Sequence, residues 1–295
     1  MPLDSPYASL MEKHGFIPAN HAAPRFFPVE ARKLYDETGE EIEGYRRIFR
    51  VDTKKTLNIT SDSYSLITNE DAFGAFEGQL AKSSLDCTGM QIGTDYASEG
   101  ARVFRQYLLP AHQVEVKPGV AVALRLLMLN SYDGSLRFQG RAGAYNFVCA
   151  NTSIHGTDLA GFKVKHTGAI DLTGAVAGLV KAAQDHVHEV EKWRIWPSIR
   201  IADLQARALI QATPTIAKST VDHLVHAYMV ARDTDELQGG PNLWTLFNVL
   251  TAWSTHGNQD EADARRGFGA QVRTDRETSV RKLVAGPEWA RAIAG

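Results

Sequence analysis

The sequence predicts an α+β protein with a mainly antiparallel sheet, an early helix and a helical C-terminal half. From about residue 45 to residue 142, apart from one helical segment, apolar runs of strand length alternate with turns rich in Gly, Pro, Asn and Asp. Beyond His166, apolar residues recur with the spacing of amphipathic helices. With 295 residues, 44% of them hydrophobic, the chain can bury a core without disulfides or a structural metal. Strands grouped ahead of helices indicate an α+β fold.

The chain divides into three predicted regions. Residues 1–43 contain several prolines and an acidic run over 36–43, and they show no sustained period, so we expect an N-terminal arm. Residues 44–196 are expected to form an α+β core domain. Residues 197–295 are expected to form a helical C-terminal region.

The core domain is expected to contain a hairpin, a helix and further strands. The two hairpin strands, the helix capped by Thr68 or Asn69, and three long strands are predicted over 45–51, 56–60, 69–80, 85–94, 101–109 and 120–130. The last strand is apolar on both faces apart from Arg125, which predicts a central position in the sheet. Residues 136–141 alternate between apolar and polar, which predicts a strand with one basic face. That face carries Arg137, Gln139 and Arg141.

Amphipathic helices fill the rest of the chain. They are predicted over 172–196, ended by Pro197, and then over 201–211, 219–232, 243–256 and 274–285. Four tryptophans lie within them: Trp193, Trp196, Trp244 and Trp253. Their aromatic area suits a core or a subunit interface, and the sequence leaves both open.

The charge is unevenly distributed. The net charge of −2 is unlike the strongly basic balance of simple nucleic-acid binders. Residues 1–98 carry a net −5, residues 99–217 a net +4 and residues 218–295 a net −1. No apolar run reaches the length of a membrane span, and the N-terminus lacks a secretory signal. We therefore expect a cytoplasmic protein without a membrane partner, whose Cys87 and Cys149 are buried thiols rather than a disulfide.

Patterns for catalysis are missing from the sequence. There is no G-x-S-x-G or H-E-x-x-H segment and no complete phosphate-binding loop, so no catalytic residue and no cofactor is expected. His186 and His188 are two residues apart on a helix and cannot face one ion together. His223 and His226 share a helix face but have no third ligand nearby, so no metal site is expected. A metal-dependent enzyme that uses His166 or the pair His223 and His226 is the least favoured alternative.

Three segments follow one another in a fixed order in the middle of the chain: N-S-Y-D-G-S over 130–135, V-C-A-N-T over 148–152, and K-V-K-H-T-G over 163–168. In this order, together with the late helix over 242–253, they resemble a phage- and plasmid-borne family, the domain-of-unknown-function family 932. The resemblance extends from about Tyr45 to the C-terminus. It implies a fold and a phage or plasmid context rather than a mechanism. It also singles out His166, which we expect to tie a strand end to the following helix.

Cations and aromatic residues accompany these segments. We expect this mixture to contact single-stranded DNA, because cations track phosphates while aromatic rings stack on bases. The expected contacts are Arg102, Arg105, Tyr107, Arg137, Arg141, Tyr145, Lys163 and Lys165. The alternative is that they are ordinary solvent-facing cations on a sheet, with Tyr107 pointing into the core.

The predicted order of a helix, several long antiparallel strands and a long helix also resembles the core of phage single-strand annealing proteins of the Red-beta, RecT and Erf kind. This resemblance implies a DNA-binding phage protein that anneals strands without ATP, in recombination or replication. It further implies a homo-oligomer, a ring or a filament, with single-stranded DNA as its partner. The competing interpretation is an antirestriction or counter-defence protein whose acidic arm binds a host protein.

Overall fold

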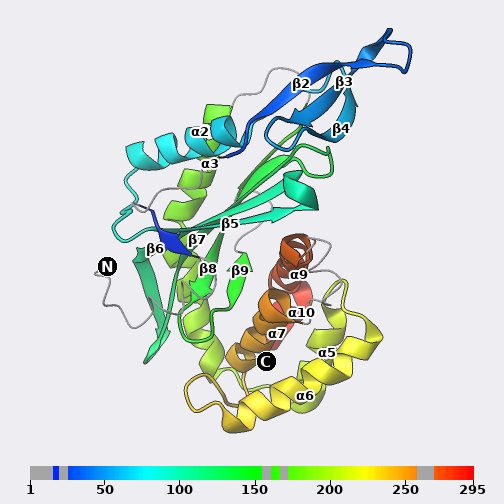
Figure 1. Ribbon diagram of the computed structural model, residues 1–295. Coiled ribbons are helices and arrows are strands. Elements are labelled where there is room, and N and C mark those ends of the chain that lie inside the picture. The colour runs from blue at the N-terminus through cyan, green and yellow to red at the C-terminus, as the bar shows by residue number, and fades with distance from the viewer. Residues whose placement is uncertain (1–15, 20–25, 155–160, 167–171, 258–268) are drawn as a thin grey trace.

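The computed structural model describes residues 16–19, 26–154, 161–166, 172–257 and 269–295. Within them the fold is α+β, as the sequence predicts, with strands first and most helices in the C-terminal half (Figure 1). All strand pairs among the described residues are antiparallel. The strands form two separate sheets.

The main sheet contains seven strands within the described residues. Their order is β1-β5-β6-β7-β8-β10, and β9 pairs with β8. Their bounds are β1 (Ile17–Pro18), β5 (Gln91–Ala97), β6 (Arg102–Lys117), β7 (Val120–Ser131), β8 (Phe138–Asn146), β9 (Thr152–Ile154) and β10 (Gly161–Val164). Gly119 turns β6 into β7 with φ +77°, a left-handed conformation that favours glycine. The predicted central position of β7 is confirmed, since β6 and β8 flank it.

A second sheet contains three strands in the order β2-β3-β4. They are β2 (Val29–Tyr35), β3 (Glu41–Arg50) and β4 (Lys55–Ser61), so the predicted hairpin is confirmed. The end of the expected arm is therefore part of a sheet, because the acidic run makes the turn between β2 and β3. The Asp36 carboxylate there accepts hydrogen bonds from Thr38 N and Glu40 N, each at 2.9 Å. Such local bonds favour a tight turn.

The helices follow the predicted periodicity with some differences at their ends. They are α2 (Asn69–Lys82), α3 (Leu172–Gln184), α4 (His186–Glu191), α5 (Asp203–Ala212), α6 (Lys218–Thr234), α7 (Leu243–His256), α9 (Gly269–Val284) and α10 (Pro287–Ala294), with 3₁₀ turns η1 (Ser98–Gly100) and η2 (Lys192–Ser198). Thr68 caps α2, accepting a hydrogen bond from Asp71 N at 3.1 Å. The single helix predicted over 172–196 is three consecutive pieces, α3, α4 and η2.

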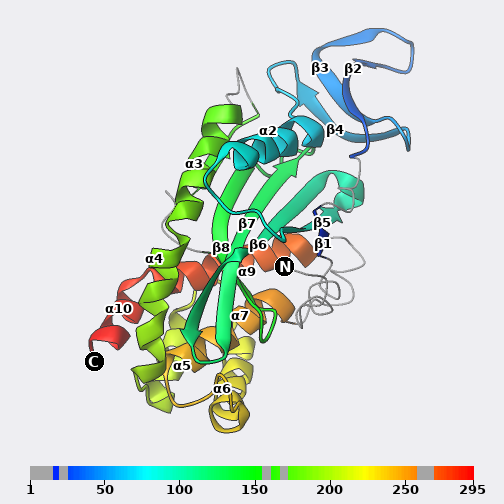
Figure 2. The same ribbon diagram turned by 90° about the vertical axis from the view of Figure 1, so that its left-hand side faces the viewer.

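Helices cover both faces of the main sheet. On one face, residues of α2 and α3 such as Phe76 and Leu179 pack on β5, β6, β7 and β8. On the other, α9 reaches the sheet, and Ala270 packs against a cluster that includes Phe104 and Leu127. Figures 1 and 2 show α2 and α3 on one side of these strands and α7 and α9 on the other. The main sheet is therefore an interior layer.

The C-terminal helices share one core with the far ends of β6, β7 and β8. Trp193, Trp196 and Trp244 are buried in it, and Trp289 of α10 joins them. Trp253 is half-buried beneath the Arg276 guanidinium, 5.2 Å from its ring centroid. Of the two interpretations that the sequence leaves open, these tryptophans form a core. The three-stranded sheet lies at the opposite end of the molecule from α5 and α6 (Figures 1 and 2).

Two further findings concern single features. No helix among the described residues combines the length and the apolar character that crossing a membrane requires. Cys87 and Cys149 are both free and half-buried, and burial raises the pKa of each thiol.

Candidate functional site

Two predicted DNA contacts, Arg105 and Tyr107, lie in the core beneath α2. Both side chains are completely buried. Arg105 Nη2 donates to the Glu77 carboxylate of α2 at 3.0 Å, and the Tyr107 hydroxyl donates to the same carboxylate at 2.8 Å. Burial raises the pKa of Tyr107 well above its usual value. The predicted surface position of both residues is wrong, because α2 covers this face and a buried cation needs a carboxylate partner.

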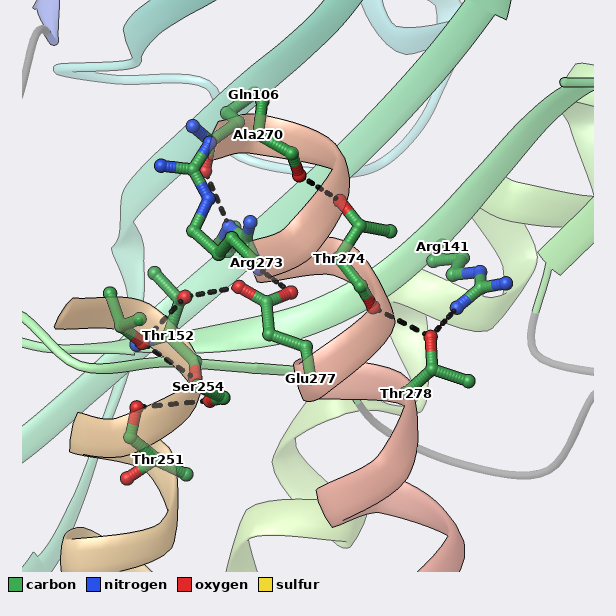
Figure 3. Close-up of polar contacts among 12 residues, drawn as sticks. Gln106, Arg141, Thr152, Thr251, Ser254, Ala270, Arg273, Thr274, Glu277 and Thr278 are labelled. Carbon is green, nitrogen blue, oxygen red and sulfur yellow. Dashed lines mark hydrogen bonds and ion pairs between the residues drawn. The ribbon is translucent and has the colours of Figure 1, made fainter. Parts of the chain in front are cut away.

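Tyr145 and Arg141 face the other side of the sheet. Tyr145 is 1% exposed, and its ring meets the ring of Phe16 edge-on at a centroid distance of 5.6 Å. It is therefore a core residue and offers no surface for stacking, contrary to the prediction. Arg141 is half-buried, and its Nη1 donates to Thr278 Oγ1 at 2.5 Å (Figure 3). The part of the predicted basic face that carries Arg141 thus lies against α9.

The other predicted cations differ in their exposure. Arg102 is half-buried and pairs with Asp133, with 2.7 Å between Nε and Oδ2. Arg137 and Lys165 are exposed. Arg137 directly precedes Phe138, the first residue of β8, and Lys165 directly follows Val164, the last residue of β10. Because Phe138 and Val164 are paired, the two cations lie at the same end of these strands. Lys163 lies in β10, where its backbone is opposite Gln139.

The first family segment, residues 130–135, holds the start of α2. Asn130 Nδ2 donates to Ile67 O at 3.0 Å and to Asn69 Oδ1 at 2.9 Å. The Tyr132 hydroxyl accepts a hydrogen bond from Asn69 N at 2.8 Å. Asn130 and Tyr132 are buried. This segment therefore positions the helix that covers the main sheet.

The second family segment fastens two C-terminal helices to the sheet. Asn151 Nδ2 donates to Asn248 O of α7 at 3.0 Å. Thr152 N donates to Thr255 Oγ1 of α7 at 2.9 Å, and the Thr152 hydroxyl donates to Glu277 of α9. These side chains link helices about one hundred residues away in the sequence.

His166 of the third segment is buried, and neither of its ring nitrogens has a hydrogen-bond partner among the described residues. Its ring stacks on Tyr64 with a centroid distance of 5.1 Å and an interplanar angle of 2°, and its carbonyl accepts a hydrogen bond from Ser65 N at 2.9 Å. Burial lowers its pKa. It joins the end of β10 to the segment ahead of α2. The predicted link to the following helix stays a prediction, because residues 167–171, of which 167 and 168 belong to this segment, lie outside the described residues.

A buried ion pair links the middle of the main sheet to α9. Arg125 of β7 and Glu277 of α9 are both about 1% exposed, and 2.9 Å separates Nη1 from Oε2. Gln106 Oε1 accepts a second hydrogen bond from Arg125 Nε at 2.7 Å. Glu277 points from α9 toward Thr152 (Figure 3). Such a pair stabilises only while both charges are present, because an isolated buried charge is costly.

The three-stranded sheet presents an outer face that faces away from the body of the protein. We define it as Arg32 of β2, Tyr45, Arg47 and Phe49 of β3, and Ile59 of β4. Alternation along β3 puts its three members on one side, and Arg32 and Ile59 are both directly opposite Arg47. The inner face, which includes Ile48, packs on Tyr132 of the body.

The two arginines of the outer face lie over one ring. The Arg32 guanidinium is 4.3 Å and that of Arg47 4.8 Å from the Phe49 centroid, a cation–π geometry. Arg32 also pairs with exposed Glu30 at 2.8 Å. Within the described residues Arg47 has no ion-pair partner, and its buried Nε has no acceptor. Tyr45 is 52% and Ile59 54% exposed beside them.

The histidines do not gather into a metal site in the part of the chain that the structure describes, where no group of three or more His, Cys, Asp and Glu side chains is placed to hold an ion. His186 is buried, and this burial, with a smaller effect of His112, lowers its pKa to about 4. His188 is exposed, and its Nδ1 atom lies 3.6 Å from Oε2 of Glu191.

The fold defines the class: an α+β protein with a helix-covered antiparallel sheet and a second sheet that exposes one face. Residues 56–285 match a family described as "Domain of unknown function (DUF932)", and the chain belongs to this family. Comparisons with curated proteins and with solved structures gave no match. The family match begins within β4, so β2 and β3, which carry most of the outer face, precede it.

The sequence interpretation missed the outer face and the partner of Arg125. The alternation in Tyr-Arg-Arg-Ile-Phe over residues 45–49 indicates such a face. The prolines and acids of residues 1–43 predict an arm, however, so a strand before residue 45 that would widen the sheet is not expected. A lone Arg125 in an apolar strand predicts a buried carboxylate partner. No sequence pattern indicates that this partner is Glu277, 152 residues later.

Proposed function

We propose that this protein binds single-stranded DNA on the outer face of the three-stranded sheet and promotes ATP-independent strand annealing. One observation carries the proposal: the Arg32 and Arg47 guanidiniums lie 4.3 and 4.8 Å from the Phe49 ring centroid, on a sheet face where Tyr45 and Ile59 are exposed. The proposed surface therefore differs from the strand face that the sequence indicated.

The chemistry of the outer face suits a single strand. A guanidinium that lies over a ring can still direct its terminal N–H groups at phosphate oxygens, although Nε of Arg47 is buried. The exposed Arg32–Glu30 pair is held weakly, so a phosphate can replace Glu30. Tyr45 offers an exposed ring for stacking on an unpaired base. Paired bases in a duplex have no free face, so we expect a preference for single strands.

The exposed cations Arg137 and Lys165 provide a second place for phosphates on the body. They lie near the base of the three-stranded sheet, because His166 stacks on Tyr64, three residues after the end of β4. A DNA strand that extends beyond the outer face can therefore continue over the body of the protein. Lys163 remains a predicted contact of the same region.

Annealing and assembly form the second step of the proposal. The likeness to phage annealing proteins rests on the order of a helix, several antiparallel strands and a further helix; here these are α2, β5 to β10, and α3, which is followed by α4 and η2. We propose that several copies form a ring or filament in the host cytoplasm. Each copy would hold phosphates and leave bases accessible to a complementary strand.

The test is fluorescence anisotropy of labelled single- and double-stranded oligonucleotides across a salt series. Arg32→Ala with Arg47→Ala should weaken single-strand binding about tenfold and lower the salt slope by about 2. Arg207→Ala with Lys218→Ala is the matched control, because it removes two cations at the opposite end of the molecule. Mass measurement with and without DNA tests the oligomer. Equal binding of single strands by wild type and the first variant would reject the outer face.

The alternative function, binding of a host protein as an antirestriction factor, is favoured by one separate feature. Asp36, Glu37, Glu40, Glu41 and Glu43 gather at the turn between β2 and β3, at the far tip of the same sheet, and all are exposed. Such a cluster suits a basic partner. Deleting residues 1–43 would also remove β2, so Glu37→Lys with Glu40→Lys is the cleaner variant. Capture of one host protein by wild type and its loss in this variant, with DNA binding unchanged, would support this alternative.

A further inference from the structure

Strand β2 forms an open edge of the three-stranded sheet. The strand order is β2-β3-β4, so β2 pairs with β3 on one side, and no strand among the described residues pairs with its other side. Ala31 and Lys33 of β2 are exposed. An open edge presents backbone N–H and C=O groups that can pair with another strand. The sheet lies at one end of the molecule (Figures 1 and 2), so the C-terminal helices do not block this edge.

The hydrogen bonds of β2 show which backbone groups face the open edge. Pro28 O accepts a hydrogen bond from Val51 N, directly after β3, at 3.0 Å, so the backbone of Pro28 faces the β3 side. In an antiparallel ladder, successive residues alternate between facing the partner strand and facing away from it. Val29, Ala31 and Lys33 therefore direct their N–H and C=O groups toward the open edge.

The regular part of this edge is short and has defined ends. Pro28, directly before β2, has no N–H to donate. At the other end, a register shift between Lys33 and Tyr35 interrupts the pairing of β2 with β3. Residues 29–33 are therefore the regular edge of β2, with Ala31 at its centre. Such a segment can pair with itself about a two-fold axis that passes between two copies of Ala31.

The charges of β2 favour the same register. With Ala31 opposite Ala31 of a second copy, Glu30 of each copy lies opposite Arg32 of the other, and Lys33 lies opposite Val29. Opposite charges in facing positions stabilise a strand pair, and like charges destabilise it. Moving the axis by one residue would place Arg32 opposite Arg32 or Glu30 opposite Glu30. The charges, the small Ala31 side chain and the ends of the regular edge thus agree on one register.

We propose that two copies of this protein pair antiparallel through β2, with the two-fold axis at Ala31, and so join their three-stranded sheets into one. The joined sheet carries Tyr45 and Arg47 of both copies on one outer face. The contact is isologous and closes at two copies, so a ring or filament needs a further contact. This pairing deepens the assembly step of the proposed function and rests on that step, but it needs no DNA.

Reversal of a charge tests the register. Glu30→Arg places like charges in both facing positions, so the pairing should be lost. Glu30→Arg with Arg32→Glu exchanges the two charges, so opposite charges face each other again and the pairing should return. Glu236→Arg is the matched control, because it makes the same substitution at an exposed glutamate just after α6, at the opposite end of the molecule.

A second pair of variants tests the backbone of the edge. Ala31→Pro removes an N–H that points away from β3, so it should block the pairing of two copies and leave the ladder of β2 with β3 intact. Proline is tolerated in edge strands when its missing N–H would face solvent. Ala31→Ser keeps the N–H and is the control for this variant.

The test is analytical ultracentrifugation of the full chain without DNA, at concentrations up to about 1 mM because a contact through one short strand is weak. Circular dichroism of each variant checks its fold. Wild type, Ala31→Ser, Glu236→Arg and the charge-exchanged double variant should form dimers with similar dissociation constants. Glu30→Arg and Ala31→Pro should weaken the dimer by roughly tenfold or more.

A monomeric wild type, or a dimer that either Glu30→Arg or Ala31→Pro leaves unchanged, would overturn the proposal. Oligonucleotide anisotropy of the wild type reports on the outer face separately. Single-strand binding by a protein that fails the ultracentrifugation test would reject this pairing and retain the proposed DNA binding.

Discussion

The two sheets of this protein use the same residue types for different purposes. In the main sheet, Arg105 and Arg125 are buried, and each pairs with a carboxylate from a covering helix. In the three-stranded sheet, Arg32 and Arg47 lie over Phe49 on a face without a covering helix. The two sheets differ in whether a helix covers the face that carries the arginines, and not in the residue types of the strands. A cation in a strand is therefore accessible at the surface only when no helix covers that face.

We expect the largest effect when one member of the buried pair Arg125 and Glu277 is replaced. Glu277→Ala leaves a buried cation without its partner, and we expect a loss of about 3–5 kcal/mol in the free energy of unfolding. Urea unfolding followed by circular dichroism measures it. Arg125→Met with Glu277→Leu removes both charges and should restore most of the loss, which separates the missing charge from lost packing. A loss below 1 kcal/mol in the single variant would mean that the pair does not hold sheet and helix together.

The pH dependence of stability tests the burial of His186 in α4. Burial lowers the pKa of His186 to about 4, below its unfolded value near 6.5, so the unfolded chain binds the proton more readily. Stability is complete above pH 6.5 and falls as the pH drops toward 4. We expect a loss of about 2 kcal/mol between pH 7 and pH 5. His186→Asn should flatten this part of a stability curve measured by urea unfolding at each pH; an unchanged curve would assign the loss to other groups.

Two tyrosines that the sequence suggested as DNA contacts should affect stability unequally. Tyr107→Phe removes a hydroxyl that bonds to Glu77, and it should cost about 1–2 kcal/mol. Tyr145→Phe should be neutral, because the Tyr145 hydroxyl is buried without a partner among the described residues. Thermal and urea unfolding of both variants test this. Weaker DNA binding by correctly folded Tyr145→Phe would contradict its place in the core.

Much of the fold follows from local sequence. The central position of β7, the hairpin of β3 and β4, the cap of α2 and the C-terminal helices are set by periodicity, turn residues and capping side chains. These features depend on neighbours within a few residues. The short helix α10 and the strand β2 were not foreseen, because one follows a break at Gly286 and the other lies beside an acidic turn that reads as an arm.

The candidate site was predicted less well for a physical reason. The alternation of Arg137, Gln139 and Arg141 gives the correct faces of a strand, but it carries no information on what covers them. Thr278, which bonds to Arg141, lies 137 residues away. The tryptophan-rich core likewise brings together residues from β6 to α10, so no segment of sequence contains it.

The most direct measurement compares the two proposed surfaces in one assay. Salt-dependent anisotropy with a labelled single strand would be recorded for Arg32→Ala with Arg47→Ala and for Arg137→Ala with Arg141→Ala. Each variant removes two arginines, so the comparison is matched in charge. We predict that the first variant lowers the salt slope by about 2 and weakens binding about tenfold, while the second, which removes one proposed phosphate contact, lowers the slope by about 1 and weakens binding less than the first. Loss of binding in the second variant alone would contradict the outer face and return the site to the main sheet.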